Sequence, residues 1–117
     1  MKIKTFKEII AWQRAHELTV ALYQRFRENK DFAFKDQILR AVLSIMNNIA
    51  EGFERQTDKE FVYFLHIAKG SATEVRSMLV IAQDLGYITT EQFETFDSMA
   101  VETTKITLRP DQKHQTT

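Results

Sequence analysis

The sequence predicts an all-α protein that folds as an antiparallel up-down-up-down four-helix bundle. Apolar residues recur three and four positions apart in four successive segments, which is the spacing of one face of an α-helix. Three of these segments begin with a capping-box pattern, in which Thr is followed three residues later by Glu or Gln. The single Pro, at position 110, leaves everything before it free of the strongest helix breaker.

The first helix is expected to begin at the capping box formed by Thr5 and Glu8 and to run to about Asn29. Its buried stripe comprises Ala11, Ala15, Leu18, Leu22 and Phe26. The Asn-Lys-Asp sequence that follows favours a turn.

The second helix is expected over residues 34–56, with a core stripe at helical spacing. This stripe comprises Phe34, Ile38, Val42, Ile45, Ile49 and Phe53. A capping box at Thr57 and Glu60 starts a third helix almost at once, so the two helices should pack antiparallel.

The third helix is predicted to be the longest and to end at Gly86, which is expected to form its C-cap. Its core positions are Phe61, Leu65, Ala68, Ala72, Val75, Leu79 and Ala82. A last helix should begin at Thr89 to Gln92 and extend toward Leu108 before Pro110 ends it. We therefore predict one domain over residues 1–109 and a disordered polar tail over residues 110–117.

Composition narrows the class of protein. The 117 residues are 44% apolar and 27% charged, which is typical of one globular domain. The chain has no Cys, no apolar signal segment and no apolar run long enough for a membrane span, so a cytoplasmic protein is expected. The formal charges sum to zero, but the first 30 residues carry seven Lys or Arg against three acids.

No motif points to catalysis, a metal or a cofactor. His16-Glu17 begins like a zinc-protease helix, but Val20 stands where the second His ligand is required. Neither His16 nor His66 has a Glu three residues before it, as a di-iron bundle requires. The three glycines are isolated, so no phosphate-binding loop is present. We expect a protein that is not an enzyme.

One side of the second helix carries a polar stripe, and small residues lie on the third. Gly70 and Ser71 should allow a close approach of another backbone, and Arg40 and Glu74 are expected to pair. The stripe is either structural, as a solvated face or a buried network, or a functional surface. The polar cluster comprises Arg40, Ser44, Asn47, Asn48, Glu51, Gly52, Ser71 and Glu74.

The first helix also carries an apolar and aromatic band on the side opposite its core stripe. The band comprises Ile9, Trp12, His16, Val20 and Tyr23. A monomer seldom leaves such a band in water, so it should contact another helix, either within the bundle or across a subunit interface. The subunit interface is favoured because aromatic residues are enriched at such contacts.

Several short motifs carry a resemblance to a known family. They are Ala11-Trp12-Gln13, Asp36-Gln37 with Arg40-Ala41, Asn47-Asn48-Ile49-Ala50-Glu51-Gly52, and Gly70-Ser71 with Glu74. In these residues the chain resembles the four-helix-bundle proteins encoded in intervening sequences of bacterial 23S rRNA genes. The resemblance implies a homopentameric ring without enzymatic activity. It also implies a relationship to the accessory protein of diversity-generating retroelements, which partners reverse transcriptase and RNA.

Two functions follow as expectations. The first is an oligomeric scaffold or adaptor for a protein or ribonucleoprotein partner. The alternative is weak, salt-sensitive RNA binding through the basic N-terminal region. The cations of that region are Lys2, Lys4, Lys7, Arg14, Arg25, Arg27 and Lys30.

Overall fold

The computed structural model describes residues 3–105, and within that range it contains four α-helices, one short 3-10 helix and no β-strand. The predicted all-α class is confirmed. The helices are η1 (Phe6–Glu8), α1 (Ile10–Phe26), α2 (Phe32–Glu54), α3 (Asp58–Asp84) and α4 (Thr90–Lys105). The predicted helix end at Leu108 and the predicted tail, residues 110–117, lie outside the described residues.

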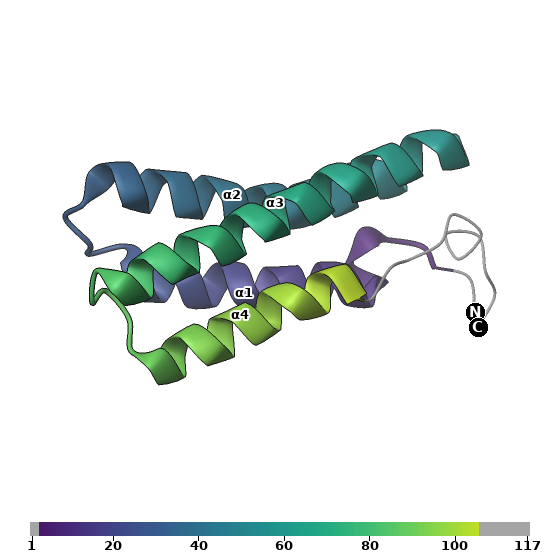
Figure 1. Cartoon of the computed structure of the whole chain (residues 1–117). Helices are drawn as coiled ribbons and strands as arrows, with labels where there is room; N and C mark the ends of the chain where they lie inside the picture. Colours follow the sequence, from purple (N-terminus) through teal and green to yellow (C-terminus); the bar gives the residue numbers. More distant parts are fainter. Residues whose placement is uncertain (1–2, 106–117) are drawn as a thin grey trace.

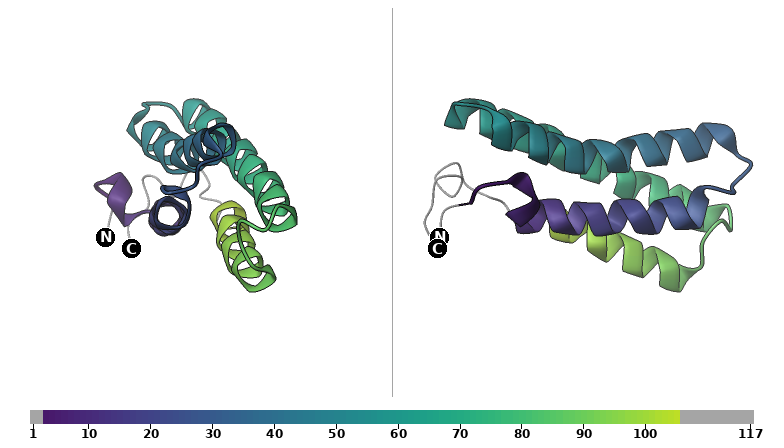
Figure 2. Two further views of the ribbon diagram at one scale, coloured as in Figure 1. Left: turned by 90° about the vertical axis from the view of Figure 1, so that its left-hand side faces the viewer. Right: turned by 180° about the vertical axis from the view of Figure 1, so that it is seen from behind.

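The helices lie side by side in an elongated body of 45 × 23 × 19 Å (Figure 1). The α1–α2 and α3–α4 connections lie at one end and the α2–α3 connection at the other, which is compatible with the predicted up-down-up-down order. α2 packs on α1 and α3, and α4 packs on the same two helices from another side (Figure 2). None of the helices in the described range is both long and apolar enough to cross a membrane.

The core lies along the centre of this body and comes from the predicted stripes. Its largest fully buried side chains include Leu18, Leu22, Ile38, Ile45 and Leu79. Leu65 was predicted to be buried, but it is only half-buried. It lies two turns into α3, near the end where the α2–α3 pair extends beyond α1 and α4 (Figure 1), so fewer helices cover it.

The later capping boxes start their helices as predicted. The Thr57 hydroxyl accepts the Glu60 N–H at 3.2 Å, and the Thr89 hydroxyl accepts the Gln92 N–H at 3.0 Å. At the other end of α3, Gly86 adopts a φ of 76°, a left-handed conformation that glycine adopts without strain.

The first capping box is different, and here the prediction was wrong. The Glu8 carboxylate accepts the N–H of Lys4 at 2.8 Å and that of Thr5 at 2.9 Å, but the turn it closes is η1. Ile9 then adopts an extended conformation, with φ −77° and ψ 121°, so α1 begins only at Ile10. The helix also ends early, at Phe26 rather than near Asn29.

A hydrogen-bonded clamp joins the two connections at one end of the bundle. The Tyr87 hydroxyl, in the α3–α4 connection, donates to the Asp31 carboxylate at 2.6 Å, and the Arg25 guanidinium donates to the Tyr87 carbonyl. Asp31 also caps α2 by accepting the Phe34 N–H at 3.2 Å, which explains why α2 begins at Phe32. Two hydrogen bonds lower the pKa of Asp31 below its ordinary value: the one from Tyr87 has the larger effect, and the one from the Phe34 N–H the smaller.

This clamp gives a prediction for pH dependence. Because the pKa of Asp31 is lower in the folded state, its contribution to stability is present above the ordinary pKa of 3.8 and is lost as the pH falls through the folded value. Tyr87→Phe should therefore reduce the loss of stability on acidification, measured by urea unfolding from pH 5 to pH 2. Tyr63→Phe, at an exposed tyrosine, should keep the wild-type pH dependence, and equal profiles for all three proteins would refute the clamp.

Candidate functional site

The centre of the predicted polar cluster is a hydrogen-bonded group that joins α2 to α3. The Asn48 amide donates to the Ser44 carbonyl at 2.8 Å and to the Ser44 hydroxyl at 2.9 Å. The Ser71 hydroxyl, from α3, donates to the same Ser44 hydroxyl at 2.8 Å. All three side chains are half-buried, so this part of the cluster fixes how the two helices meet.

The other members of the cluster point elsewhere. Glu74 accepts a hydrogen bond from Gln37, so the expected pair between Arg40 and Glu74 is wrong. Arg40 is exposed on the side of α2 that faces α1. Asn47 is also exposed, as is Glu51, which pairs with Arg55 one turn later. A carboxylate with this exposure needs no buried partner.

Gly52 makes the close helix contact that was predicted for Gly70. A Cβ at position 52 would lie 2.9 Å from the Phe64 Cβ and 3.3 Å from the Phe61 carbonyl oxygen, whereas a Cβ at position 70 would meet nothing within 4 Å. α2 and α3 are therefore in close contact at Gly52, near their shared connection, where a Cβ would force the neighbouring atoms to shift.

The hydrogen-bonded group gives a prediction for stability. Ser44→Ala removes the acceptor shared by Asn48 and Ser71, and should lower the free energy of unfolding by about 1 kcal/mol. Ser77→Ala, on the exposed face of α3, is the matched control and should cost less than about 0.5 kcal/mol. Equal unfolding midpoints for the two variants in urea would show that the group is not structural.

The aromatic band of α1 divides into a packed part and an exposed part. Ile9 was predicted to point outward, but it is 1% exposed, because the extended backbone before α1 turns it into the core. Trp12 is half-buried against the core and packs edge-on against Phe6. Its ring also stacks on that of His16, with the ring centroids 5.1 Å apart. The exposed part of the band is therefore His16, Val20 and Tyr23, with Val20 43% exposed.

The basic N-terminal residues do not form one surface. Lys4 and Lys7 precede α1, whereas Arg25, Arg27 and Lys30 lie at its other end, about 25 Å away along a 17-residue helix. Between the two groups, Arg14 pairs with Glu17 at 3.3 Å and with Glu102 at 3.7 Å. Lys2 lies outside the described residues.

Neither a cluster of metal ligands nor a serine beside a base stands out among the described side chains. No group of three or more His, Asp or Glu residues in the described range is arranged to hold a metal ion. The Ser44 and Ser71 hydroxyls bond to each other, and the other group that bonds to Ser44 is the Asn48 amide, which is not a base. The arrangement fits a structural contact between helices.

Comparisons with known proteins identify one family and one similar crystal structure. A family model described as 23S rRNA-intervening sequence protein matches residues 7–109. A crystal structure from Bacteroides thetaiotaomicron, described as a protein with unknown function from the S23 ribosomal protein family, is similar with a TM-score of 0.77. The two chains are 31% identical over 82% of this chain and 93% of that chain. A search of curated proteins found no match.

Proposed function

Because the chain belongs to the 23S rRNA-intervening sequence protein family, we propose that it is a non-enzymatic homo-oligomer that serves as a scaffold or adaptor. The assembly we propose is the pentameric ring implied by the family resemblance, built from antiparallel bundles. Its partner would be a protein or a ribonucleoprotein in the cytoplasm, a location that the absence of Cys favours.

The exposed part of the α1 band carries this proposal. His16, Val20 and Tyr23 follow one another at spacings of four and three residues, so they form a continuous strip along α1. Val20 and Tyr23 are both among the large apolar side chains that the chain leaves exposed. Burying such a strip against a second copy removes apolar surface from water, at about 25 cal/mol for each Å².

RNA binding has less support from the structure than protein assembly has. The cations that would contact phosphates are separated into two groups, and Arg14 between them is paired with acids of the same chain. Binding to phosphates gains strength from several cations acting together, so two small separate groups bind weakly. We therefore favour protein assembly as the primary function.

We expect light scattering at micromolar concentration to give a mass several times the 13.7 kDa of one chain. Val20→Glu should lower that mass because it places a charge in the exposed strip, and burying an unpaired charge is costly. Val80→Glu on α3, where the side chain is 47% exposed, is the matched control and should keep the wild-type mass. If Val20→Glu kept the wild-type mass as well, the strip would not be the contact.

A further inference from the structure

An open groove between α1 and α2 continues the exposed strip. It has a volume of about 430 Å³. Its apolar lining, which we call the floor, comprises Tyr23, Leu39 and Leu43, and its polar lining, which we call the rim, comprises Arg27, Lys35, Asp36 and Arg40. Arg27 lies one turn beyond Tyr23, so strip and groove form one surface.

The rim is predominantly positive, with three cations and one acid. Among the described residues neither Arg27 nor Arg40 makes an ion pair, and Lys35 lies 4.7 Å from the centre of the Phe32 ring. An occupant of this groove therefore needs an apolar contact for the floor and carboxylates for the rim.

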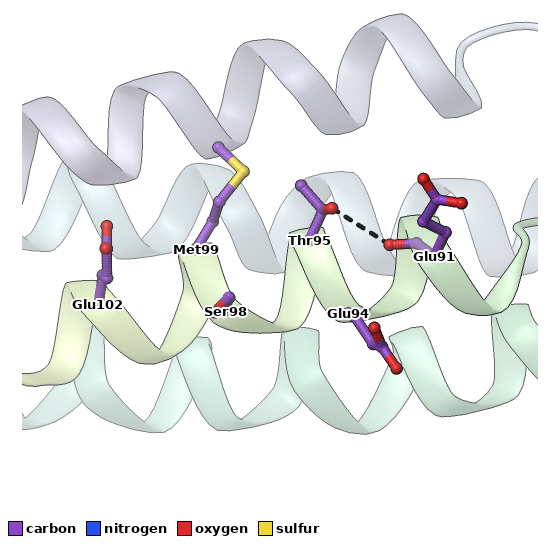
Figure 3. A pocket seen from close by; sticks show the side chains of 6 residues that line it. All are labelled: Glu91, Glu94, Thr95, Ser98, Met99 and Glu102. Carbon is purple, nitrogen blue, oxygen red and sulfur yellow. Dashed lines mark hydrogen bonds between the residues drawn. The ribbon is translucent and has the colours of Figure 1, made fainter.

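The chain itself carries a surface with that chemistry, on α4. A shallow hollow of about 430 Å³ lies along the helix and is lined by Glu91, Glu94, Thr95, Ser98, Met99 and Glu102. Figure 3 shows Glu91 and Glu94 on either side of α4, with Met99 farther along the helix. Glu91 and Glu94 make no ion pair with any described residue. Glu102 already pairs with Arg14 of the same chain, and Met99 is half-buried against the core. The carboxylates of Glu91 and Glu94 and the exposed part of Met99 are therefore what α4 offers to the groove.

The positions of the two surfaces also allow the groove of one copy to meet α4 of another copy. The groove lies at the end of α1 and the start of α2, and Glu91 and Glu94 lie at the start of α4. The clamp between Tyr87 and Asp31 shows that these are the same end of the bundle. α4 packs on α1 and α3 while the groove lies between α1 and α2, so one bundle presents the two surfaces on different sides (Figure 2).

We propose that the acidic face of α4 in one copy docks into the α1–α2 groove of the next copy, at the same level along the bundle. This inference rests on the proposed homo-oligomer and specifies its contact. Because the two surfaces differ, the contact is head-to-tail, and repeating it produces a ring or a filament rather than a two-fold dimer. When the two surfaces lie at the same level along the bundle, neighbouring copies are related by a rotation about an axis parallel to the helices, without a shift along it. Repeating such a rotation closes the assembly into a ring.

Charge reversal on the full-length chain tests the proposal. Arg27→Glu with Arg40→Glu makes the groove acidic, so it should repel α4 and lower the mass from light scattering to that of one chain. Glu91→Lys with Glu94→Lys should do the same from the other side. Combining all four substitutions in one chain restores opposite charges and should restore the wild-type mass.

The matched control changes the net charge of the chain by the same amount as the double substitution in the groove. Lys59→Glu with Lys69→Glu reverses two exposed cations on α3 and should leave the mass unchanged. Circular dichroism of each variant verifies that the helices form, so that a lower mass reports the contact and not unfolding.

The outcomes separate this contact from the proposed function. A monomeric wild-type protein would overturn both. A wild-type oligomer that keeps its mass after charge reversal, or whose fourfold variant stays monomeric, would overturn the α4 contact and leave the homo-oligomer standing. The groove would then be open to another acidic partner. Loss of assembly in both double variants, with recovery in the fourfold variant, supports the proposal.

Discussion

Ile45→Ala is expected to lower the free energy of unfolding by about 2 to 5 kcal/mol. Ile45 lies in the middle of α2, is 1% exposed and belongs to the buried core. Removing three carbon atoms loses their transfer free energy and leaves a cavity that close-packed neighbours fill only in part. The measurement is urea unfolding followed by circular dichroism, at one fixed protein concentration for all variants.

Ile81→Ala provides the matched control for this core substitution. Ile81 lies within α3 with 47% of its surface exposed, so the same change of side chain should alter stability by less than about 0.5 kcal/mol. Equal losses for Ile45→Ala and Ile81→Ala would contradict the core described here.

Gly52→Ala is expected to destabilise the protein, whereas the same substitution at Gly70 should stabilise it. In a helix interior, replacing Gly by Ala normally gains about 0.5 to 1 kcal/mol. At position 70 nothing opposes this gain, because the space around a new Cβ is open. At position 52 the new Cβ would lie 2.9 Å from the Phe64 Cβ, so α2 and α3 must move apart.

Such overpacking typically costs about 1 to 3 kcal/mol, which exceeds the gain in helix propensity. The two variants should therefore move the midpoint of urea unfolding in opposite directions. A Gly52→Ala protein as stable as Gly70→Ala would show that the two helices are not in close contact at this point.

Local signals in the sequence were sufficient where a structure depends on a few neighbouring residues. Thr57 and Thr89 each precede a helix by one residue, and the buried stripes of α2 and α3 follow the 3.6-residue spacing. The pattern at Thr5 failed because a capping box closes one turn whether or not a helix continues from it. Ile9 leaves the helical conformation, and this also explains why it is buried rather than outward-facing.

Contacts between helices were harder to predict, because spacing along one helix does not fix its register against another. Arg40 and Glu74 were both placed on the correct helices, yet Gln37 is the residue that reaches Glu74. For the same reason the sequence indicated a close approach at Gly70, when it occurs at Gly52. Ser44, Asn48 and Ser71 were identified as members of one cluster, but only the structure shows that they bond to one another.

The α1–α2 groove was not predicted as a site. Arg40 had been assigned to the polar cluster and Asp36 noted only as part of a family motif, and no site role had been given to Lys35, Leu39 or Leu43. Its signal in the sequence is the placing of cations at the end of one helix and the start of the next. That signal gains meaning only once the two helices are known to pack side by side.

The most direct test of the homo-oligomeric scaffold is native mass spectrometry of the wild-type chain, which counts the chains in each complex. We predict a dominant species of five chains, each of 13.7 kDa, that persists on dilution to low micromolar concentration. A single species at the mass of one chain across the same range would contradict the account.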